Sequence, residues 1–219
     1  MDRDALHGKH SLSKMQRQIH DQEVDIVVGT QLITKGHDFP NVTLVGVILA
    51  DLSLNLPDFR SGERTFQLLT QVAGRAGRAE KPGEVLIQTY NPKHHSLQCA
   101  KDHDTLRYLE IELKQRNLLK IPPFLSMVLI LCSSPSEKRA ETLAFSVRNR
   151  FKKLPPSLTV IGPVESPLKK LRNRYRWQVL IKAPDASMLK CQLNRLMKEP
   201  LKLQKDELLQ IDIDPHHLI

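Results

Sequence analysis

The sequence predicts an α/β protein in two parts: a parallel sheet with helices over residues 1–92 and a smaller α+β domain over residues 123–219. In the first part, short continuous runs of Val, Ile and Leu alternate with amphipathic stretches, which is typical of strands buried on both faces of a parallel sheet. In the second part, the predicted order of elements is β-α-β-β-α-β, that of the ferredoxin-like unit. Residues 93–122 are expected to form a helical connector.

The strands of the first part are predicted in three apolar runs: DIVVGT at 25–30, TLVGVILA at 43–50 and EVLIQT at 84–89. Turn residues bound each run, and helices are predicted at residues 12–22 and 61–73. Together these elements indicate part of a doubly wound domain. Three or four strands make a thin sheet, so we expect the chain to begin inside a domain.

In the connector, Asp104 is expected to cap a helix that carries a leucine stripe (Leu106, Leu109, Leu113) and ends at Ile121-Pro122-Pro123. The second part is predicted to contain strands near residues 126–133, 158–164, 174–182 and 208–212, with helices near 137–153 and 185–198. Apolar residues recur at helical spacing in both helices. They are Ala140, Leu143, Ala144, Val147 and Phe151 in the first, and Leu189, Leu193, Leu196 and Met197 in the second.

The composition favours a polyanionic partner. Lys and Arg outnumber Asp and Glu by 33 to 24, giving a formal charge of +9, and such an excess attracts nucleic acid or anionic membrane surfaces. The three cysteines are far apart and form no C-x-x-C pair, which argues against a zinc site or a disulfide framework within this chain. No apolar run approaches the ~18 residues that span a bilayer, and no signal-peptide pattern is present. We therefore expect a cytoplasmic location.

The most informative stretch is residues 71–78, QVAGRAGR. If the helix from residue 61 continues at 100° per residue, Gln71, Arg75 and Arg78 lie within roughly 60° of one another. Phe66, Leu69 and Ala73 then lie on the opposite side. Two guanidinium groups and an amide at one place suit the developing negative charge of a triphosphate. The alternative is a solvated basic helix end that complements the helix dipole.

A second polar stretch, residues 29–40 (GTQLITKGHDFP), directly follows a predicted strand, where α/β sheets place ligand loops. Thr30 and Gln31 offer a hydroxyl and an amide to a nucleic-acid phosphate. Asp38, after Gly36, offers a carboxylate to a ribose or to the arginine pair. The alternative is a polar loop in which Asp38 is only a cap.

A basic stretch lies at residues 168–177, LKKLRNRYRW. At strand period two, Arg172, Arg174 and Arg176 share one face, while Tyr175 and Trp177 share the other. The arginines, with Lys169 and Lys170, suit a nucleic-acid backbone, whereas the aromatic rings are expected to face the core. His94, His95, His103, His216 and His217 are interpreted as surface histidines, and no metal site is expected.

Residues 29–40 followed by Q-x-x-G-R-x-G-R resemble motifs V and VI of superfamily 2 helicases. The neighbouring sequence is similar to the primosomal helicase (PriA) family in DFRSGER at 58–64, PGEVLIQT at 82–89, Pro122-Pro123-Phe124, Ile161-Gly162-Pro163, RYRWQ at 174–178 and Asp212-Ile213-Asp214-Pro215. The resemblance covers essentially the whole chain. It implies that residues 1–92 are part of the second RecA-like lobe and that residues 123–219 form a domain resembling ribosomal protein S10.

The resemblance further implies an ATP-dependent 3′→5′ DNA helicase for replication restart. Gln71, Arg75 and Arg78 would contact the γ-phosphate, Gly36 and Asp38 would couple the nucleotide to DNA, and Thr30 would touch the DNA backbone. ATP and Mg²⁺ are expected as cofactors, with zinc in the intact protein but not in this chain. DNA forks, single strands, the acidic tail of single-stranded DNA-binding protein and other primosome proteins are the implied partners.

The sequence departs from the family in what it lacks. It contains no G-x-x-x-x-G-K-[ST] motif, no D-E-x-H-like carboxylate pair and no cysteine-rich zinc insertion, so we expect this chain alone not to hydrolyse ATP. The competing interpretation is a non-catalytic nucleic-acid-binding scaffold without the ATP-binding lobe. A purely S10-like RNA-binding protein is disfavoured because it leaves residues 1–92 unexplained.

Overall fold

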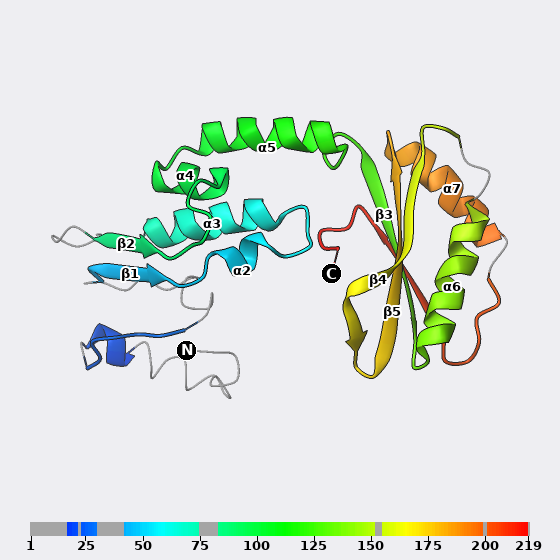
Figure 1. Cartoon of the computed structure of the whole chain (residues 1–219), viewed down its shortest axis with the longest axis horizontal. Coiled ribbons are helices and arrows are strands. Elements are labelled where there is room, and N and C mark those ends of the chain that lie inside the picture. Colours follow the sequence, from blue (N-terminus) through cyan, green and yellow to red (C-terminus); the bar gives the residue numbers. More distant parts are fainter. Residues whose placement is uncertain are drawn as a thin grey trace. The chain divides into compact units, whose positions relative to one another are not determined.

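The computed structural model describes residues 17–21, 23–29, 42–74, 83–151, 155–198 and 201–218 (Figure 1). The chain forms two compact units. One comprises Met1–Leu56 and Ser61–Ile111, and the other comprises Pro57–Arg60 and Glu112–Ile219. The segment expected to be a connector therefore contributes residues to both units.

The first unit contains the parallel strand pair that the sequence predicts. Strands β1 (Leu44–Val47) and β2 (Glu84–Ile87) pair from Leu44↔Glu84 to Val47↔Ile87. Helices α2 (Asp51–Leu54), α3 (Ser61–Ala73) and α4 (His95–Lys101) accompany them. Both strands are shorter than expected, and α2 and α4 were not anticipated from the sequence. Residues 17–20 are helical, as predicted, and the rest of that predicted helix lies largely outside the described residues.

The strand expected at residues 25–30 is wrong where the structure describes it. Residues 26–29 form no strand, and Ile26 and Val28 are 82% and 78% exposed. Strands β1 and β2 pair only with each other among the described residues. An apolar run indicates that a segment tends to be buried. The segment forms a strand only where a neighbouring strand provides partners for its backbone hydrogen bonds.

Only one face of the pair β1–β2 is covered by described residues, whereas burial on both faces was expected. Exposed and half-buried residues alternate along both strands. The half-buried Val47 and Ile87 pack against the core of this unit. On the other face, Leu44 and Leu86 are exposed. The core consists of Ala50, Phe66, Leu69, Leu97, Cys99, Ala100 and Tyr108.

Helix α5 (Thr105–Leu119) begins and ends where the sequence predicts. Asp104 caps it by accepting a hydrogen bond from Arg107 N at 2.9 Å. The leucine stripe Leu106, Leu109 and Leu113 is exposed, however, and Tyr108 and Glu112 are the buried positions. The spacing of the leucines places them on one side of the helix, but it does not predict that the opposite side, with Tyr108 and Glu112, is the buried one.

The second unit contains a four-stranded sheet and two helices. These are β3 (Ser126–Ser134), α6 (Glu137–Arg150), β4 (Thr159–Leu171), β5 (Arg174–Ala183), α7 (Ala186–Lys198) and β6 (Leu208–Ile213). The sheet order is β4-β5-β3-β6, and all neighbours are antiparallel. The two strands joined by α6 are thus separated by β5, and the two joined by α7 are separated by β3. This split β-α-β arrangement confirms the predicted ferredoxin-like unit.

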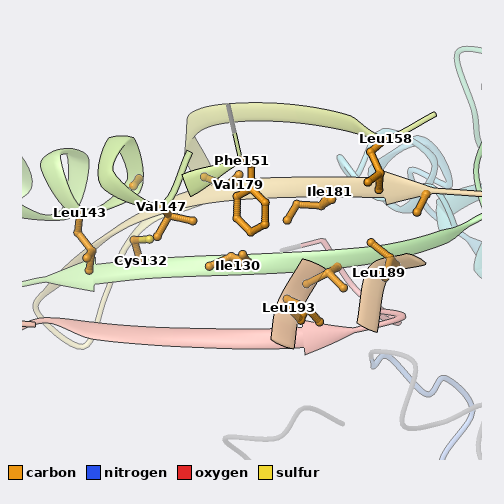
Figure 2. Close-up of a cluster of buried hydrophobic side chains, with 13 residues drawn as sticks. Ile130, Cys132, Leu143, Val147, Phe151, Leu158, Val179, Ile181, Leu189 and Leu193 are labelled. Carbon is orange, nitrogen blue, oxygen red and sulfur yellow. The ribbon is translucent and has the colours of Figure 1, made fainter. Parts of the chain in front are cut away.

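Helices α6 and α7 lie on one face of this sheet and cover its core (Figures 1 and 2). Leu143 and Val147 of α6 and Leu189 of α7 pack against Ile130 and Val179 of the central strands. The predicted apolar stripe of α6 is therefore confirmed. Burial in this layer also raises the pKa of the Cys132 thiol to about 12, which keeps the thiol protonated.

Strands β4 and β5 form a long hairpin whose shape depends on two backbone features. The turn residues Arg172 and Asn173 have φ values of 48° and 62°, the left-handed conformation that tight hairpin turns require. Gly162 has φ 96°, and a Cβ added there would lie 2.7 Å from Gln178 O. No side chain fits at this irregularity between Ile161 and Val164.

Candidate functional site

Gln71 lies in the last turn of α3, on its exposed side. Phe66, Leu69 and Val72 of the same helix are buried. This orientation agrees with the expectation that Gln71 faces away from the apolar side. Arg75 and Arg78 lie outside the described residues, so their convergence with Gln71 stays a prediction.

Gly74 continues the hydrogen bonding of α3, because its N–H donates to Thr70 O at 3.0 Å. A Cβ added at Gly74 would meet that same oxygen at 3.5 Å, an ordinary van der Waals distance. Packing among the described residues therefore does not require glycine here.

Helix α3 is held firmly along its length. Near its start, Thr65 Oγ1 donates to Ser61 O at 2.8 Å and lies 2.9 Å from Ser53 Oγ. In the middle, the ring of Phe66 stacks on Tyr108 with centroids 4.0 Å apart and planes 2° from parallel. These contacts give Gln71 a rigid support, which a group that must meet a phosphate needs.

Asp51 fastens the carboxyl ends of β1 and β2. It accepts hydrogen bonds from Thr89 Oγ1 and Tyr90 N, both at 3.0 Å, and Asn91 N donates to Thr89 Oγ1 at 3.0 Å. The bond from Tyr90 N–H lowers the pKa of Asp51, with a smaller contribution from the Thr89 hydroxyl. Sequence reasoning missed this residue, although an Asp that opens a helix directly after a strand was a usable signal.

The predicted phosphate and coupling residues of the second polar stretch (Thr30, Gln31, Gly36 and Asp38) lie outside the described residues. Their roles stay predictions.

Arg174, predicted to bind DNA, is engaged within the protein. Its Nη2 donates to Ser133 O at 3.0 Å and to Asp206 O at 2.7 Å, and its Nε donates to Ser133 Oγ at 3.3 Å. The guanidinium thus joins β5, β3 and the segment before β6. Sequence reasoning missed this because the partners are 41 and 32 positions away.

The two lysines of the hairpin have different surroundings. Lys169 Nζ lies 2.8 Å from Glu137 Oε1 and 3.0 Å from Glu165 Oε1. These two hydrogen bonds raise the pKa of Lys169, and the bond to Glu137 has the larger effect. Lys170 Nζ lies 4.7 Å from the centre of the Tyr175 ring, a cation–π distance. Lys169 is therefore balanced by two carboxylates, and Lys170 keeps its charge available beside an aromatic ring.

The expectation that Arg172 shares a strand face with Arg174 and Arg176 is wrong, because Arg172 lies in the hairpin turn. Arg172 is exposed and Arg176 is half-buried. Trp177 packs against the core, as expected, whereas Tyr175 lies beside Lys170. The hairpin thus presents Lys170, Tyr175 and Arg172 near its tip, with Arg176 further along β5.

The histidines are not all simple surface residues. The half-buried His94 caps α4 by accepting from Ser96 N at 3.2 Å, and its ring stacks on His95 at 4.6 Å. His95 in turn stacks on Tyr108 at 5.6 Å. Among the residues that the structure describes, no three His, Cys, Asp or Glu side chains are grouped so that they could hold a metal ion. No described helix is long and apolar enough to cross a membrane.

Two family models match the chain and define its class. Residues 3–80 match the helicase conserved C-terminal domain, and residues 117–216 match the primosomal protein N C-terminal domain. The chain therefore carries a helicase C-terminal region followed by a C-terminal domain of the primosomal protein N type. It belongs to the family of replication restart protein PriA and corresponds to the C-terminal part of that helicase.

The most similar relatives include replication restart protein PriA from Bacillus subtilis, 39% identical over 100% of this chain and 28% of the relative. The protein of the same name from Synechocystis is 38% identical over 98% of this chain and 26% of the relative. That from Haemophilus influenzae is 35% identical over 100% of this chain and 30% of the relative. The chain thus spans less than a third of the length of these three relatives.

Proposed function

We propose that this chain supplies the second motor lobe and the C-terminal domain of an ATP-dependent 3′→5′ DNA helicase that acts in replication restart and primosome assembly, in the cytoplasm. The observation that carries the proposal is the placement of Gln71. It is exposed at the end of a helix whose other side is buried, three residues before the Gly-Arg-Ala-Gly-Arg sequence. A polar amide on a rigid support, followed by two arginines, suits contact with a phosphate.

In this proposal, Gln71, Arg75 and Arg78 meet the γ-phosphate of a nucleotide bound mainly by another lobe. The guanidinium groups neutralise charge that develops on the phosphate oxygens, which is most valuable in the transition state. When bound, ATP with Mg²⁺ supplies the phosphoryl group that is cleaved. Gly36 and Asp38 couple this site to DNA, and Thr30 and Gln31 contact the DNA backbone.

No zinc is proposed for this chain, although the family resemblance implies zinc in the intact protein. Cys99 and Cys132 are buried in the cores of different units, so these two thiols do not form a ligand pair. Cys191 is exposed.

The hairpin β4–β5 is proposed to contact the DNA backbone through Lys170, Arg172 and Arg176. Tyr175, beside Lys170, offers a ring edge or face to an unpaired base. Lys169 contributes less, because two glutamates already balance its charge. Arg174 is left out of the contact, since its guanidinium is bonded within the protein. The basic balance of the chain also suits the acidic tail of single-stranded DNA-binding protein and other primosome proteins as partners.

The test is binding of a fluorescent oligo-dT strand to the 219-residue chain as salt is raised. The double variant Arg172→Ala/Arg176→Ala is expected to weaken binding and to lower the slope of log K against log salt by about 0.7 for each phosphate that the protein no longer neutralises. Arg139→Ala/Lys190→Ala, two exposed cations on α6 and α7, is the matched control. Equal slopes for the two double variants would remove the hairpin from the DNA interface.

A further inference from the structure

The four residues Pro57–Arg60, which precede α3 in the chain, belong structurally to the second unit. Their side chains contact His216, His217 and Arg116, which belong to the same unit. They stand directly before the helix that carries Gln71, because Arg60 is bonded to Ser61, the first residue of α3.

Asp58 is the buried member of this segment, with a side chain that is 0% exposed. Its Oδ1 accepts a hydrogen bond from Arg60 N at 2.9 Å. Its Oδ2 lies 3.7 Å from His217 Nδ1, too far for a hydrogen bond but within the range of an ion pair. A buried carboxylate is stable only when such partners remain in place.

Arg60 contacts the preceding histidine of the tail. Its Nη1 lies 2.8 Å from His216 Nδ1. Arginine is always a donor, so Nδ1 of His216 is the acceptor in this contact. The two adjacent histidines therefore contact the two polar residues of the segment.

Phe59 adds an aromatic contact. The guanidinium carbon of Arg116 lies 5.6 Å from the centre of the Phe59 ring. Arg116 Nε also donates to Glu112 Oε1 at 2.8 Å, and these two side chains are only 13% and 11% exposed. The ring is thus placed against a cation that is already held in position by its neighbour on α5.

The tail that carries the two histidines is itself fixed to the sheet. Asp214 N donates to Met127 O at 2.8 Å, and Met127 N donates to Asp214 Oδ1 at 3.3 Å. Pro215, the next residue, is buried. His216 and His217 are therefore presented from the anchored end of β6.

We propose that Asp58, Arg60, His216 and His217 form a clasp through which the C-terminal domain positions the start of α3 and thereby Gln71. The clasp residues are positioning residues, not catalytic ones. The His217 side chain is 67% exposed, and an ion pair with such an exposed member is individually weak. The consequence for turnover rests on the proposed function of Gln71, whereas the clasp itself does not.

The first experiment is hydrogen–deuterium exchange on the 219-residue chain. In His216→Ala/His217→Ala, the amides of residues 65–69 in α3 are expected to exchange roughly three to ten times faster, as for the loss of one hydrogen bond. The amides of β3 and β5 should keep the wild-type rate. His20→Ala, which removes another histidine beside an aspartate, is the control. Unchanged exchange in α3, or equally faster exchange throughout β3 and β5, would overturn the clasp.

The second experiment measures ATP turnover with the phosphate-binding lobe present. Arg60→Met, which keeps the side-chain stem but removes the donors, is expected to lower kcat roughly tenfold with KM for ATP unchanged, because a misplaced Gln71 affects mainly the transition state. A raised KM with unchanged kcat would refute the positioning role. If Gln71→Ala has normal turnover, the proposed function of Gln71 fails, and the exchange experiment still decides whether the clasp exists.

Discussion

Replacing Gly162 with alanine should test how tightly the β4–β5 hairpin is specified. The backbone at this position has φ 96°, and a positive φ costs an L-residue about 1–2 kcal/mol. The new Cβ would also lie 2.7 Å from Gln178 O and 3.1 Å from Val164 N. Both are backbone atoms, so the strands must shift, at about 1–3 kcal/mol. The sum predicts a destabilisation of roughly 2–5 kcal/mol.

The assay is urea unfolding followed by fluorescence of Trp177, the single tryptophan, which packs against the core of the second unit. With a dependence of about 2 kcal/mol per molar urea, the midpoint should fall by roughly 1–2.5 M. Gly46→Ala is the control, because no atom lies within 4 Å of a Cβ added there, and it should leave this midpoint in place. An unchanged midpoint for Gly162→Ala would refute the steric reasoning.

Three further predictions concern the core, the sheet edge and the motor. Leu143→Ala, in the packed layer under α6, should destabilise the second unit by about 2–5 kcal/mol in the same urea assay; a loss below about 1 kcal/mol would contradict the packing shown in Figure 2. The pKa of Asp51 is lowered from 3.8 in the folded state, so its contribution to stability is present above pH 3.8 and is lost as the pH falls through the lowered pKa. Asp51→Asn should therefore flatten the dependence of unfolding on acid pH. An unaltered pH profile would exclude this contribution of Asp51. With the phosphate-binding lobe supplied, Arg78→Ala should abolish ATP turnover while DNA affinity, measured by anisotropy, is retained; normal turnover would refute its role.

Elements with strong periodicity could be predicted from the sequence. The stripe of α6, the strand β3 and the cap of α5 each depend on neighbouring residues, and each appears where expected. The segment at 26–29 shows the limit, since its apolar character does not supply a pairing strand. The leucine stripe of α5 shows another, because the stack of Tyr108 on Phe66 places a different side of that helix in the core.

The candidate sites were predictable only in part. The exposure of Gln71 follows from helical geometry alone. The environments of the hairpin cations do not, because they depend on tertiary partners: Ser133 for Arg174 and Glu137 for Lys169. Arg172 was misplaced because a tight turn interrupts the strand period. The clasp residues Asp58 and His217 are far apart in the sequence, and no local pattern links them.

The pairing of Lys169 with Glu137 and Glu165 has a consequence for electrostatics. A polyanion approaching the hairpin meets a lysine whose charge is balanced by two neighbouring carboxylates. The net charge of +9 is a sum over the whole chain and does not describe the potential at this place. Neutralising either glutamate would raise the local positive potential without adding any cation. The strength of nucleic-acid binding here is therefore governed as much by the acidic residues of α6 and β4 as by the basic ones.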